Sequence, residues 1–261
     1  MFDLTALGSA LAGTIFAEKF FFTSVTESTN IDAMAAARAG AAHGSVYFAD
    51  EQRAGRGRGG HQWHSAAGEG LYVSVVLRPT ASVQRWPLLP LCAGLAAMNA
   101  IREVTSVTPD LRWPNDVLIG AKKVCGILVE AGTDSKGVGF AVVGIGINVH
   151  QRAFSVDLAT PATSLDLETG SHTSRQKLLV RLLESLQRET EGLAEDDAMR
   201  RILAKVENSS TWLRGRRVEV HGPQACTGLT AGLDENGFLR VQTSAGTVTV
   251  QTGGIRAAEM D

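Results

Sequence analysis

The chain has 261 residues, of which 44% are hydrophobic and 20% are charged. These values are close to those of ordinary globular proteins, and the length is enough for one large domain, with or without a small appendage. The formal net charge is −2, so the composition does not favour non-specific binding of nucleic acid by a strongly basic surface.

Cysteine usage and the apolar segments indicate a soluble, cytoplasmic protein without a membrane partner. Cys92, Cys125 and Cys226 lie far apart and form no pattern typical of a metal site or a disulfide framework, so reduced thiols are expected. The longest uncharged segment, 86–101, contains two prolines and falls short of the ~20 apolar residues that span a bilayer. No basic region precedes the first apolar segment, as a signal peptide would require.

The first forty residues predict a helix, a strand and a second helix. Apolar residues recur at helical spacing over 4–17, and the aromatic and β-branched residues at 19–25 are typical of a strand. Asn30 is expected to cap a helix over 31–38, which Gly40 ends.

The central part of the chain predicts a sheet with one buried helix. The expected elements are strands at 45–49, 71–77, 117–119, 124–130 and 139–149, and a helix at 87–104. Glycines interrupt the last of these strands. Such glycines indicate that another group approaches the backbone closely.

The last hundred residues predict helices followed by a small β unit. Residues 160–170 are expected to form a loop, Ser174 to cap an amphipathic helix with a leucine face, and 196–208 to form another helix. Short β segments then alternate with turns, at 218–220, 229–233, 238–241 and 247–250. They predict an antiparallel, barrel-like unit of roughly fifty residues that packs on the main domain.

Residues 55–60 read GRGRGG and formally match the GxGxxG pattern of dinucleotide-binding folds. That pattern needs a helix directly after the glycines, whereas Trp63 and a β segment follow here. The glycines permit close approach to a ligand, and Arg56 and Arg58 carry planar cations suited to phosphate. Considered alone, residues 55–60 fit a solvent-exposed turn and an anion-binding loop equally well.

Other polar groups occur at points where elements are expected to begin or end. We call residues 55–60 the Gly/Arg loop. The motifs are STN at 28–30, Gln52 shortly before the Gly/Arg loop, Trp63 after it, RWPND at 112–116, KKVCGILVE at 122–130 and GIGINV at 144–149. Each one alone fits an ordinary structural role: a helix N-terminus, a core indole, a turn or an exposed lysine.

In their order along the chain, these motifs resemble the catalytic domain of the biotin protein ligases. Order and spacing match from residue 20 to residue 149, and the likeness continues more loosely beyond. The resemblance implies an α+β fold related to class II aminoacyl-tRNA synthetases, with a mixed, mainly antiparallel sheet and helices, followed by a small SH3-like β-barrel. The implied domains are a catalytic domain at 1–213 and the barrel at 214–261. Because the chain begins almost at the catalytic domain, it resembles the monofunctional type, which lacks the DNA-binding domain.

The resemblance implies an ATP-dependent ligase. Such an enzyme activates biotin with ATP to biotinyl-5′-AMP and transfers biotin to a lysine of a biotin carboxyl carrier domain. Mg²⁺ is expected with ATP, without a fixed metal site, and no DNA partner is expected. A monomer and a homodimer are both compatible with the sequence.

The resemblance also implies the roles of individual residues. Lys123 would bridge the biotin carboxylate and the α-phosphate, Arg58 would close over the intermediate, and Asp116 would orient the incoming lysine or accept its proton. The implied biotin-binding residues are Ser28, Thr29, Asn30, Gln52, Arg56, Gly57, Arg58, Lys123, Gly126 and Leu128. The implied residues for ATP and the adenylate are Arg56, Arg58, Trp63, Asn115, Lys123 and Asn148.

Two other functions are compatible with parts of the sequence. A lipoate or octanoate protein ligase would use the same fold and similar chemistry, although the complete GRGRGG and KKVCGIL motifs favour biotin. A nucleic-acid-binding protein would use the Gly/Arg loop and the C-terminal β unit, but the loop is short and lacks interleaved aromatic residues.

Overall fold

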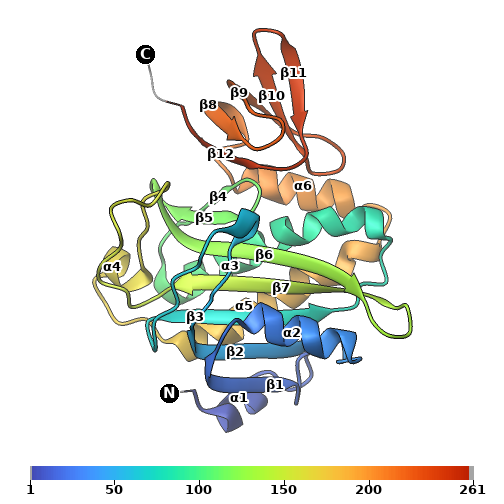
Figure 1. The fold of residues 1–261 in the computed structure, drawn as a ribbon, viewed down its shortest axis with the longest axis vertical. Coiled ribbons are helices and arrows are strands. Elements are labelled where there is room, and N and C mark those ends of the chain that lie inside the picture. The colour runs from blue at the N-terminus through green and yellow to red at the C-terminus, as the bar shows by residue number, and fades with distance from the viewer. Residues whose placement is uncertain (1, 259–261) are drawn as a thin grey trace.

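Two β-sheets organise the chain in the structure, a computed structural model that describes residues 2–258. The larger sheet has seven strands in the order β1-β2-β3-β7-β6-β5-β4 (Figure 1). Its strands are β1 (Phe20–Thr26), β2 (Ser45–Gln52), β3 (Gly70–Leu77), β4 (Asp110–Arg112), β5 (Asp116–Ile119), β6 (Lys122–Thr133) and β7 (Gly139–Asn148). β1 and β2 pair in parallel, and the other neighbouring pairs of this sheet are antiparallel. The expected mixed, mainly antiparallel sheet is therefore confirmed.

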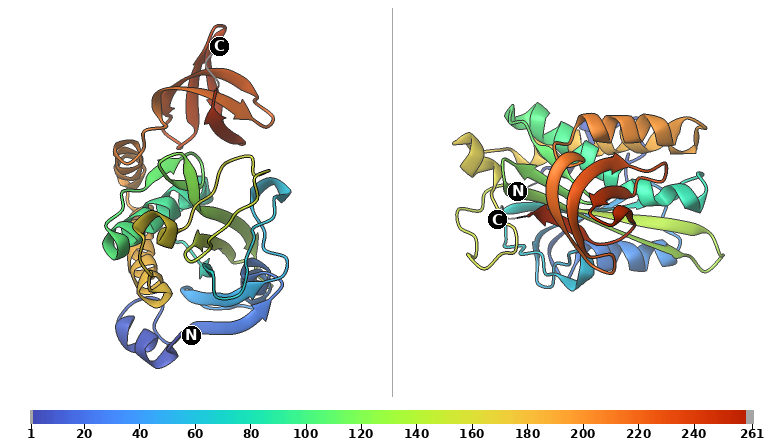
Figure 2. Two further views of the ribbon diagram at one scale, coloured as in Figure 1. Left: turned by 90° about the vertical axis from the view of Figure 1, so that its left-hand side faces the viewer. Right: turned by 90° about the horizontal axis from the view of Figure 1, so that it is seen from above.

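Helices cover both faces of the larger sheet (Figures 1 and 2). On one face, α2 (Thr29–Arg38) packs on β2, β3 and β7; on the other, α3 (Leu89–Thr105) packs on β6 and β7 beside α5 (Arg175–Glu191). Because side chains alternate between the faces of a strand, Val75 of β3 joins the large core, while Val76 joins the small core beneath α2. Within residues 2–258, no helix has the length and apolar character needed to cross a membrane.

The helix α5 forms as its leucine spacing predicts. Ser174 caps it, because its hydroxyl accepts a hydrogen bond from the backbone N–H of Lys177 at 3.3 Å. Five leucines of this helix are fully buried: Leu178, Leu179, Leu182, Leu183 and Leu186. They pack on α3, where a Cβ at Gly94 would come within 2.5 Å of Leu111 Cδ1. The small residues of α3 thus let the two-helix layer lie close to the sheet.

Several element boundaries differ from the prediction. The first helix, α1, spans Leu4–Ala10 and does not reach residue 17, because the chain turns at Gly13, whose φ is 79°. Asn30 does not cap α2 but lies inside it, and Ser28 occupies the capping position. The physical reason is that the Asn30 side chain is engaged with the sheet beneath the helix, as described below.

Three short elements, α4, β4 and β12, were not predicted. The expected loop at 160–170 contains α4 (Leu165–Thr169), which begins where the Ser164 hydroxyl accepts a hydrogen bond from Leu167 N at 3.3 Å. The strand β12 (Gly254–Ala257) is only four residues long and forms by pairing with β8. The strand β4 has three residues and forms by pairing with β5. All three elements are too short to carry a periodic signal, and tertiary contacts define them.

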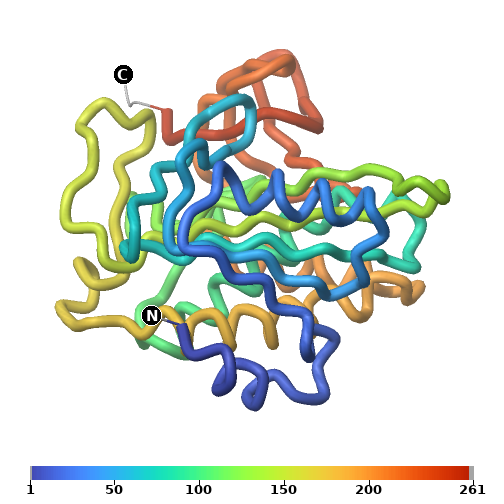
Figure 3. Tube along the Cα trace, turned by 60° about the horizontal axis from the view of Figure 1, so that its bottom comes forward, coloured from blue at the N-terminus to red at the C-terminus, as the bar shows by residue number. Residues whose placement is uncertain are grey.

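The smaller sheet forms the C-terminal unit. Its strands are β8 (Arg214–His221), β9 (Cys226–Leu233), β10 (Leu239–Thr243), β11 (Gly246–Val250) and β12, in the order β11-β10-β9-β8-β12. The connecting helix is α6 (Ala198–Asn208), and short 3₁₀ turns precede α3 (Val83–Leu88) and α6 (Gly192–Ala194). The unit packs on the main domain, as expected: Trp113 Nε1 donates to the Gly237 carbonyl at 3.0 Å. Figure 3 shows the loop between β2 and β3 beside the last strand of this unit.

Replacing Leu182 with Ala tests the importance of the contact between α3 and α5. The side chain is fully buried, so Leu182→Ala should lower the free energy of unfolding by about 2–5 kcal/mol. Denaturant titration measures the effect, and Leu167→Ala is the matched control, because Leu167 is 50% exposed. Equal losses in the two variants would contradict this description of the core.

Candidate active site

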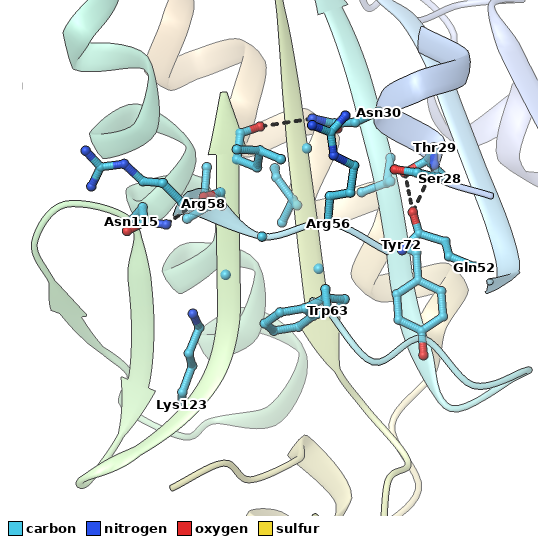
Figure 4. A pocket seen from close by; sticks show the side chains of 18 residues that line it. Ser28, Thr29, Asn30, Gln52, Arg56, Arg58, Trp63, Tyr72, Asn115 and Lys123 are labelled. Atoms are coloured by element: carbon cyan, nitrogen blue, oxygen red, sulfur yellow. Dashed lines mark hydrogen bonds between the residues drawn. The ribbon is translucent and has the colours of Figure 1, made fainter. Parts of the chain in front are cut away.

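The predicted site residues gather in a hollow over β3, β7 and β6, between α2 and the Gly/Arg loop (Figure 4). The residues of the predicted set that line it are Ser28, Thr29, Asn30, Gln52, Arg56, Gly57, Arg58, Trp63, Asn115, Lys123, Gly126 and Leu128. Asp116 and Asn148 do not line this hollow. Both line a larger cleft beside it, which shares Arg58, Trp63 and Lys123 with the hollow.

At one end of the hollow, α2 begins against the end of β2. The Gln52 side-chain oxygen accepts hydrogen bonds from Thr29 N at 2.9 Å and Thr29 Oγ1 at 3.1 Å. The Gln52 amide nitrogen donates to Ser65 Oγ at 2.8 Å. These bonds orient the Gln52 amide and leave one of its N–H groups for a ligand. The Ser28 side chain makes no capping bond, so its hydroxyl is also free to bind one.

Asn30 anchors α2 to the sheet. Its side-chain oxygen accepts from Ser74 Oγ at 2.6 Å, and its amide donates to Glu130 Oε2 at 3.0 Å. The backbone of β7 lies so close that a Cβ at Gly144 would come within 2.1 Å of Asn30 Oδ1. Ser74 also shares a hydrogen bond of 2.8 Å with Thr29 Oγ1. Asn30 therefore supports the wall of the hollow from within a buried polar network.

Sequence reasoning missed Ser74 and Glu130 as parts of this site. Ser74 is fully buried in β3, and a lone serine within the apolar segment LYVSVVL was a signal that could have revealed it. Glu130 ends the KKVCGILVE motif, and its Oε1 lies 4.0 Å from Arg56 Nη1. Arg56 thus lies near a carboxylate of the sheet while its side chain is 54% exposed.

The Gly/Arg loop folds back on itself as a narrow hairpin. Gly57 N donates to the His61 carbonyl at 2.7 Å, and Trp63 N donates to the Gly55 carbonyl at 2.9 Å. A 3₁₀ turn (Arg58–Gly60) forms the tip, where Gly59 has a φ of 67°. A side chain at Gly55 would collide with the Trp63 carbonyl, 2.4 Å from its Cβ. The glycines therefore permit the tight return that places both arginines at the hollow.

Arg58 joins the loop to the C-terminal unit. Its guanidinium donates to the Gly253 carbonyl and to Thr252 Oγ1, the latter at 2.9 Å. Burial lowers the pKa of Arg58, and the charge of Asp116 opposes that shift. The guanidinium stays protonated, since arginine does not lose its proton in proteins. Sequence analysis assigned no role to Thr252 or Gly253, because nothing in the sequence indicates that β12 returns to this loop.

Trp63 lies on the glycine-lined surface of β6 and β7. A Cβ at Gly126 would come within 2.9 Å of the indole, and one at Gly146 within 2.5 Å of its Nε1. Within the described residues, Nε1 is buried and has no hydrogen-bond partner. The close approach predicted from the glycines of β7 is thus explained by an aromatic ring that stands between the hollow and the larger cleft.

A cluster of two cations around one carboxylate lies where the hollow and the larger cleft meet. Asp116 Oδ1 is 2.5 Å from Lys123 Nζ, and Asp116 Oδ2 is 2.6 Å from Arg112 Nη2. Burial by itself would raise the pKa of Asp116, but the charges of Lys123 and Arg112 outweigh it, and the net effect is a lowered pKa. We call these three residues the ionic triad. Arg112 is 6% exposed and was not among the predicted site residues, although it opens the RWPND motif.

Two asparagines are held by backbone groups. Asn115 exchanges two hydrogen bonds with Ile127, at 2.7 and 3.0 Å, which fixes the turn after Trp113 to β6. Asn148 Nδ2 donates to the Thr163 carbonyl at 3.0 Å. Cys125 is fully buried beside them, and burial raises the pKa of its thiol. The thiol is therefore a packing group rather than a nucleophile.

The larger cleft lies between the main domain and the C-terminal unit. Its walls come from the tip of the Gly/Arg loop, the turn at 112–116, the segment 151–162, and residues 221–223 and 252–256 of the C-terminal unit. A small hollow therefore adjoins a wider cleft, with Lys123, Arg58 and Trp63 lining both.

Comparison with known proteins shows similarity along most of the chain. Residues 22–148 match the model of the biotin/lipoate A/B protein ligase family. A biotin–[acetyl-CoA-carboxylase] ligase of Mycobacterium tuberculosis is 36% identical over 237 residues, which cover 88% of this chain and 85% of that protein. The biotin protein ligase of Aquifex aeolicus, solved in complex with biotin and ATP, superposes with a TM-score of 0.78 at 30% identity, covering 92% of this chain and 98% of that one.

A second kind of relative is longer. The bifunctional ligase/repressor BirA of Bacillus subtilis is 36% identical over 171 residues, which are 65% of this chain but 53% of that protein. The chain thus matches about half the length of this relative. From these similarities, the chain belongs to the biotin protein ligases within the biotin/lipoate A/B protein ligase family.

The ionic triad generates a prediction about pH. Because the folded-state pKa of Asp116 lies below its ordinary value of 3.8, the ionised carboxylate contributes stability above that pH, and the contribution is lost as the pH falls through the folded pKa. Carboxyl-carbon NMR should give a midpoint below 3.8 for Asp116, and Lys123→Gln should raise it. Lys122→Gln is the control, since Lys122 pairs with Glu168 instead. If Lys123→Gln does not change the titration midpoint of Asp116, the ion pair between the two residues is refuted.

Proposed function

We propose that this protein activates biotin with ATP to biotinyl-AMP and then transfers biotin to a lysine of a biotin carboxyl carrier domain. The observation that carries the proposal is the position of Lys123, at the junction between a small hollow and a wider cleft. The similar proteins, which include a biotin–[acetyl-CoA-carboxylase] ligase and a ligase solved with biotin and ATP, support the same reaction.

In this proposal biotin occupies the hollow with its ureido ring at the start of α2. The ring has one carbonyl acceptor and two N–H donors. The free hydroxyl of Ser28, the Thr29 hydroxyl and the oriented amide of Gln52 are suited to them. Loss of one buried partner should cost about 1–3 kcal/mol of binding. The Leu128 side chain and the glycine backbone of β7 at Gly144 and Gly146 would line the apolar remainder of biotin.

The first chemical step brings two anions together. A carboxylate oxygen of biotin attacks the α-phosphorus of ATP, the bond to the β-phosphate oxygen breaks, and pyrophosphate leaves. Lys123 would neutralise the approaching groups by exchanging part of its contact with Asp116 for the substrate oxygens. Arg56 and Arg58 would cover the acyl adenylate and exclude water. Mg²⁺ would enter as the counter-ion of the ATP phosphates, that is, as part of the substrate.

We assign the larger cleft to the nucleotide. Trp63, Asn115 and Asn148 line it and are our candidates for contacts with adenosine. The bonds from Arg58 to Thr252 and Gly253 give the C-terminal unit a direct connection to the loop that would cover the adenylate.

Asp116 fits a positioning role better than that of a base. A carboxylate whose pKa is lowered by two cations accepts a proton poorly. Its negative charge holds Lys123 and Arg112 in place. In the second step, the acceptor lysine attacks the acyl carbon and AMP leaves, and Asp116 would attract the incoming ammonium group.

The proposal extends to architecture and setting. We infer a relationship to class II aminoacyl-tRNA synthetases and an SH3-like barrel at the C-terminus, with a boundary between residues 213 and 214, where β8 begins.

The need for ATP supports a cytoplasmic location. The outer edge of β1, the last strand of the larger sheet, is suited to pairing in a homodimer.

A nucleic-acid-binding function is not supported by the arginine contacts. Arg58 donates to the C-terminal unit, and Arg56 faces Glu130. Arg58 is therefore engaged by protein groups. The Arg56 side chain is 54% exposed, but one exposed arginine does not form the basic surface that binding of a nucleic-acid backbone requires.

Pyrophosphate release with different acids tests the proposed function. Purified protein with Mg-ATP should release pyrophosphate with biotin, and mass spectrometry of the bound product should identify biotinyl-AMP. Release with lipoate or octanoate alone would overturn the substrate while keeping the chemistry. No release with any of the three acids would overturn the activity.

Replacing Lys123 tests the proposed centre of the reaction. Lys123→Ala removes the cation between the two anions, so the rate of biotin-dependent pyrophosphate release should fall by about 10²–10³-fold. Lys122→Ala, a change of the neighbouring and more exposed lysine, should leave the rate within about twofold of the parent. A normal rate in Lys123→Ala, with folding verified by circular dichroism, would remove this residue from the mechanism.

A further inference from the structure

Two histidines and an aspartate converge outside the proposed active site. His150 follows the end of β7, Asp166 lies in α4, and His172 precedes the start of α5. His150 Nδ1 is 2.8 Å and His172 Nδ1 is 3.5 Å from the same oxygen, Asp166 Oδ2. One nitrogen of each imidazole and one carboxylate oxygen all lie within 4.8 Å of one another. Three separate segments of the chain thus bring potential ligands to one point.

The backbone around two of these groups is firmly held. His150 N donates to the Glu69 carbonyl at 2.7 Å, and Asp166 N donates to the Val149 carbonyl at 2.9 Å. Asp166 Oδ1 accepts a hydrogen bond from Thr173 N at 2.8 Å, which leaves Oδ2 directed at the two imidazoles. A carboxylate oriented by a backbone N–H is the kind of outer support found around metal ligands.

The third group has the freedom that chelation requires. The two imidazole rings are stacked, with centroids 4.3 Å apart and planes 8° apart. An ion cannot lie in the plane of both parallel rings, so one ring must turn. His172 is able to turn because its side chain is 80% exposed, whereas the side chains of His150 and Asp166 are each 18% exposed. Ligand atoms about 3.3 Å apart suit a tetrahedral ion with bonds of about 2.0–2.1 Å, so rotation of the His172 side chain must bring its nitrogen to that distance from the other two ligand atoms.

We propose that His150, Asp166 and His172 form a binding site for a divalent transition metal ion of the zinc class. Two neutral imidazole nitrogens and one carboxylate oxygen are ligands that suit Zn²⁺ rather than Mg²⁺ or Ca²⁺, which prefer oxygen alone. Water completes the coordination. This site is separate from the Mg-ATP of the proposed reaction and does not depend on that function.

The bound ion stabilises one wall of the larger cleft. His150 and Asp166 lie at the two ends of the segment whose residues 151, 154, 158–160 and 162 line the cleft. That segment also carries Thr160, which accepts from Arg112 at 3.0 Å, and leads to Thr163, which accepts from Asn148 at 3.0 Å. A metal ion that joins the two ends restricts the motion of the whole segment by closing it as a loop.

Metal titration tests the proposal. The probe is Zn²⁺ alone, titrated into the parent protein in competition with a chromogenic chelator, with Co²⁺ absorption as a second readout of coordination geometry. The parent should bind one ion, and His172→Ala should lower its affinity at least about tenfold, since even supporting residues of metal sites contribute 10–100-fold. His172 is exposed, so this variant retains the fold.

A matched variant separates this cluster from a lone histidine beside a carboxylate. His221 Nε2 lies 3.9 Å from Glu219 Oε2, away from the cluster. His221→Ala should therefore bind Zn²⁺ as the parent does. Absence of Zn²⁺ binding by the parent, or equal binding by the parent and His172→Ala, would overturn the proposal and leave an ordinary hydrogen-bonded histidine–aspartate cluster.

Discussion

The ion pairing of Asp116 with Lys123 and Arg112 is the interaction on which the arrangement of the site depends. A carboxylate that is largely removed from solvent is stabilised here by two cations, and removal of Asp116 would leave Lys123 and Arg112 close together without their shared counter-charge. The three residues come from the end of β4, the start of β5 and the start of β6. Their pairing therefore holds together the strand ends at which the hollow meets the cleft.

Arg112 extends this interaction to distant parts of the chain. Its guanidinium carbon lies 5.4 Å from the ring of Trp212, and that of Arg216 lies 3.8 Å from the same ring. The indole of Trp212 therefore contacts two arginines at the point where the chain enters the C-terminal unit. With the bonds of Arg58 to the same unit, this gives the C-terminal unit two connections to the site. The C-terminal unit is thus connected to Lys123 through Trp212, Arg112 and Asp116.

Close backbone packing is the second constraint on the site. Gly126 and Gly146 form a flat surface on which Trp63 lies, and Gly144 gives Asn30 access to the sheet. Any side chain at these positions would occupy the space of the indole or the amide. At these positions β6 and β7 have no side chains of their own, so the Trp63 and Asn30 side chains pack directly on the strand backbone. This explains the glycines of the GIGINV motif.

The sequence by itself determined the main elements, because hydrophobic periodicity is a local property, and its motifs carried the family resemblance that implied the mixed, mainly antiparallel sheet and the polar residues of the hollow. The tertiary structure decided what local patterns do not contain: the place of Asn30 inside α2, the short elements α4 and β12, the engagement of Arg112 and Ser74, and the return of Thr252 and Gly253 to Arg58. It also decided the meeting of His150, Asp166 and His172. The physical reason is that burial and charge pairing depend on distances between residues far apart in the chain, and only the folded packing sets those distances.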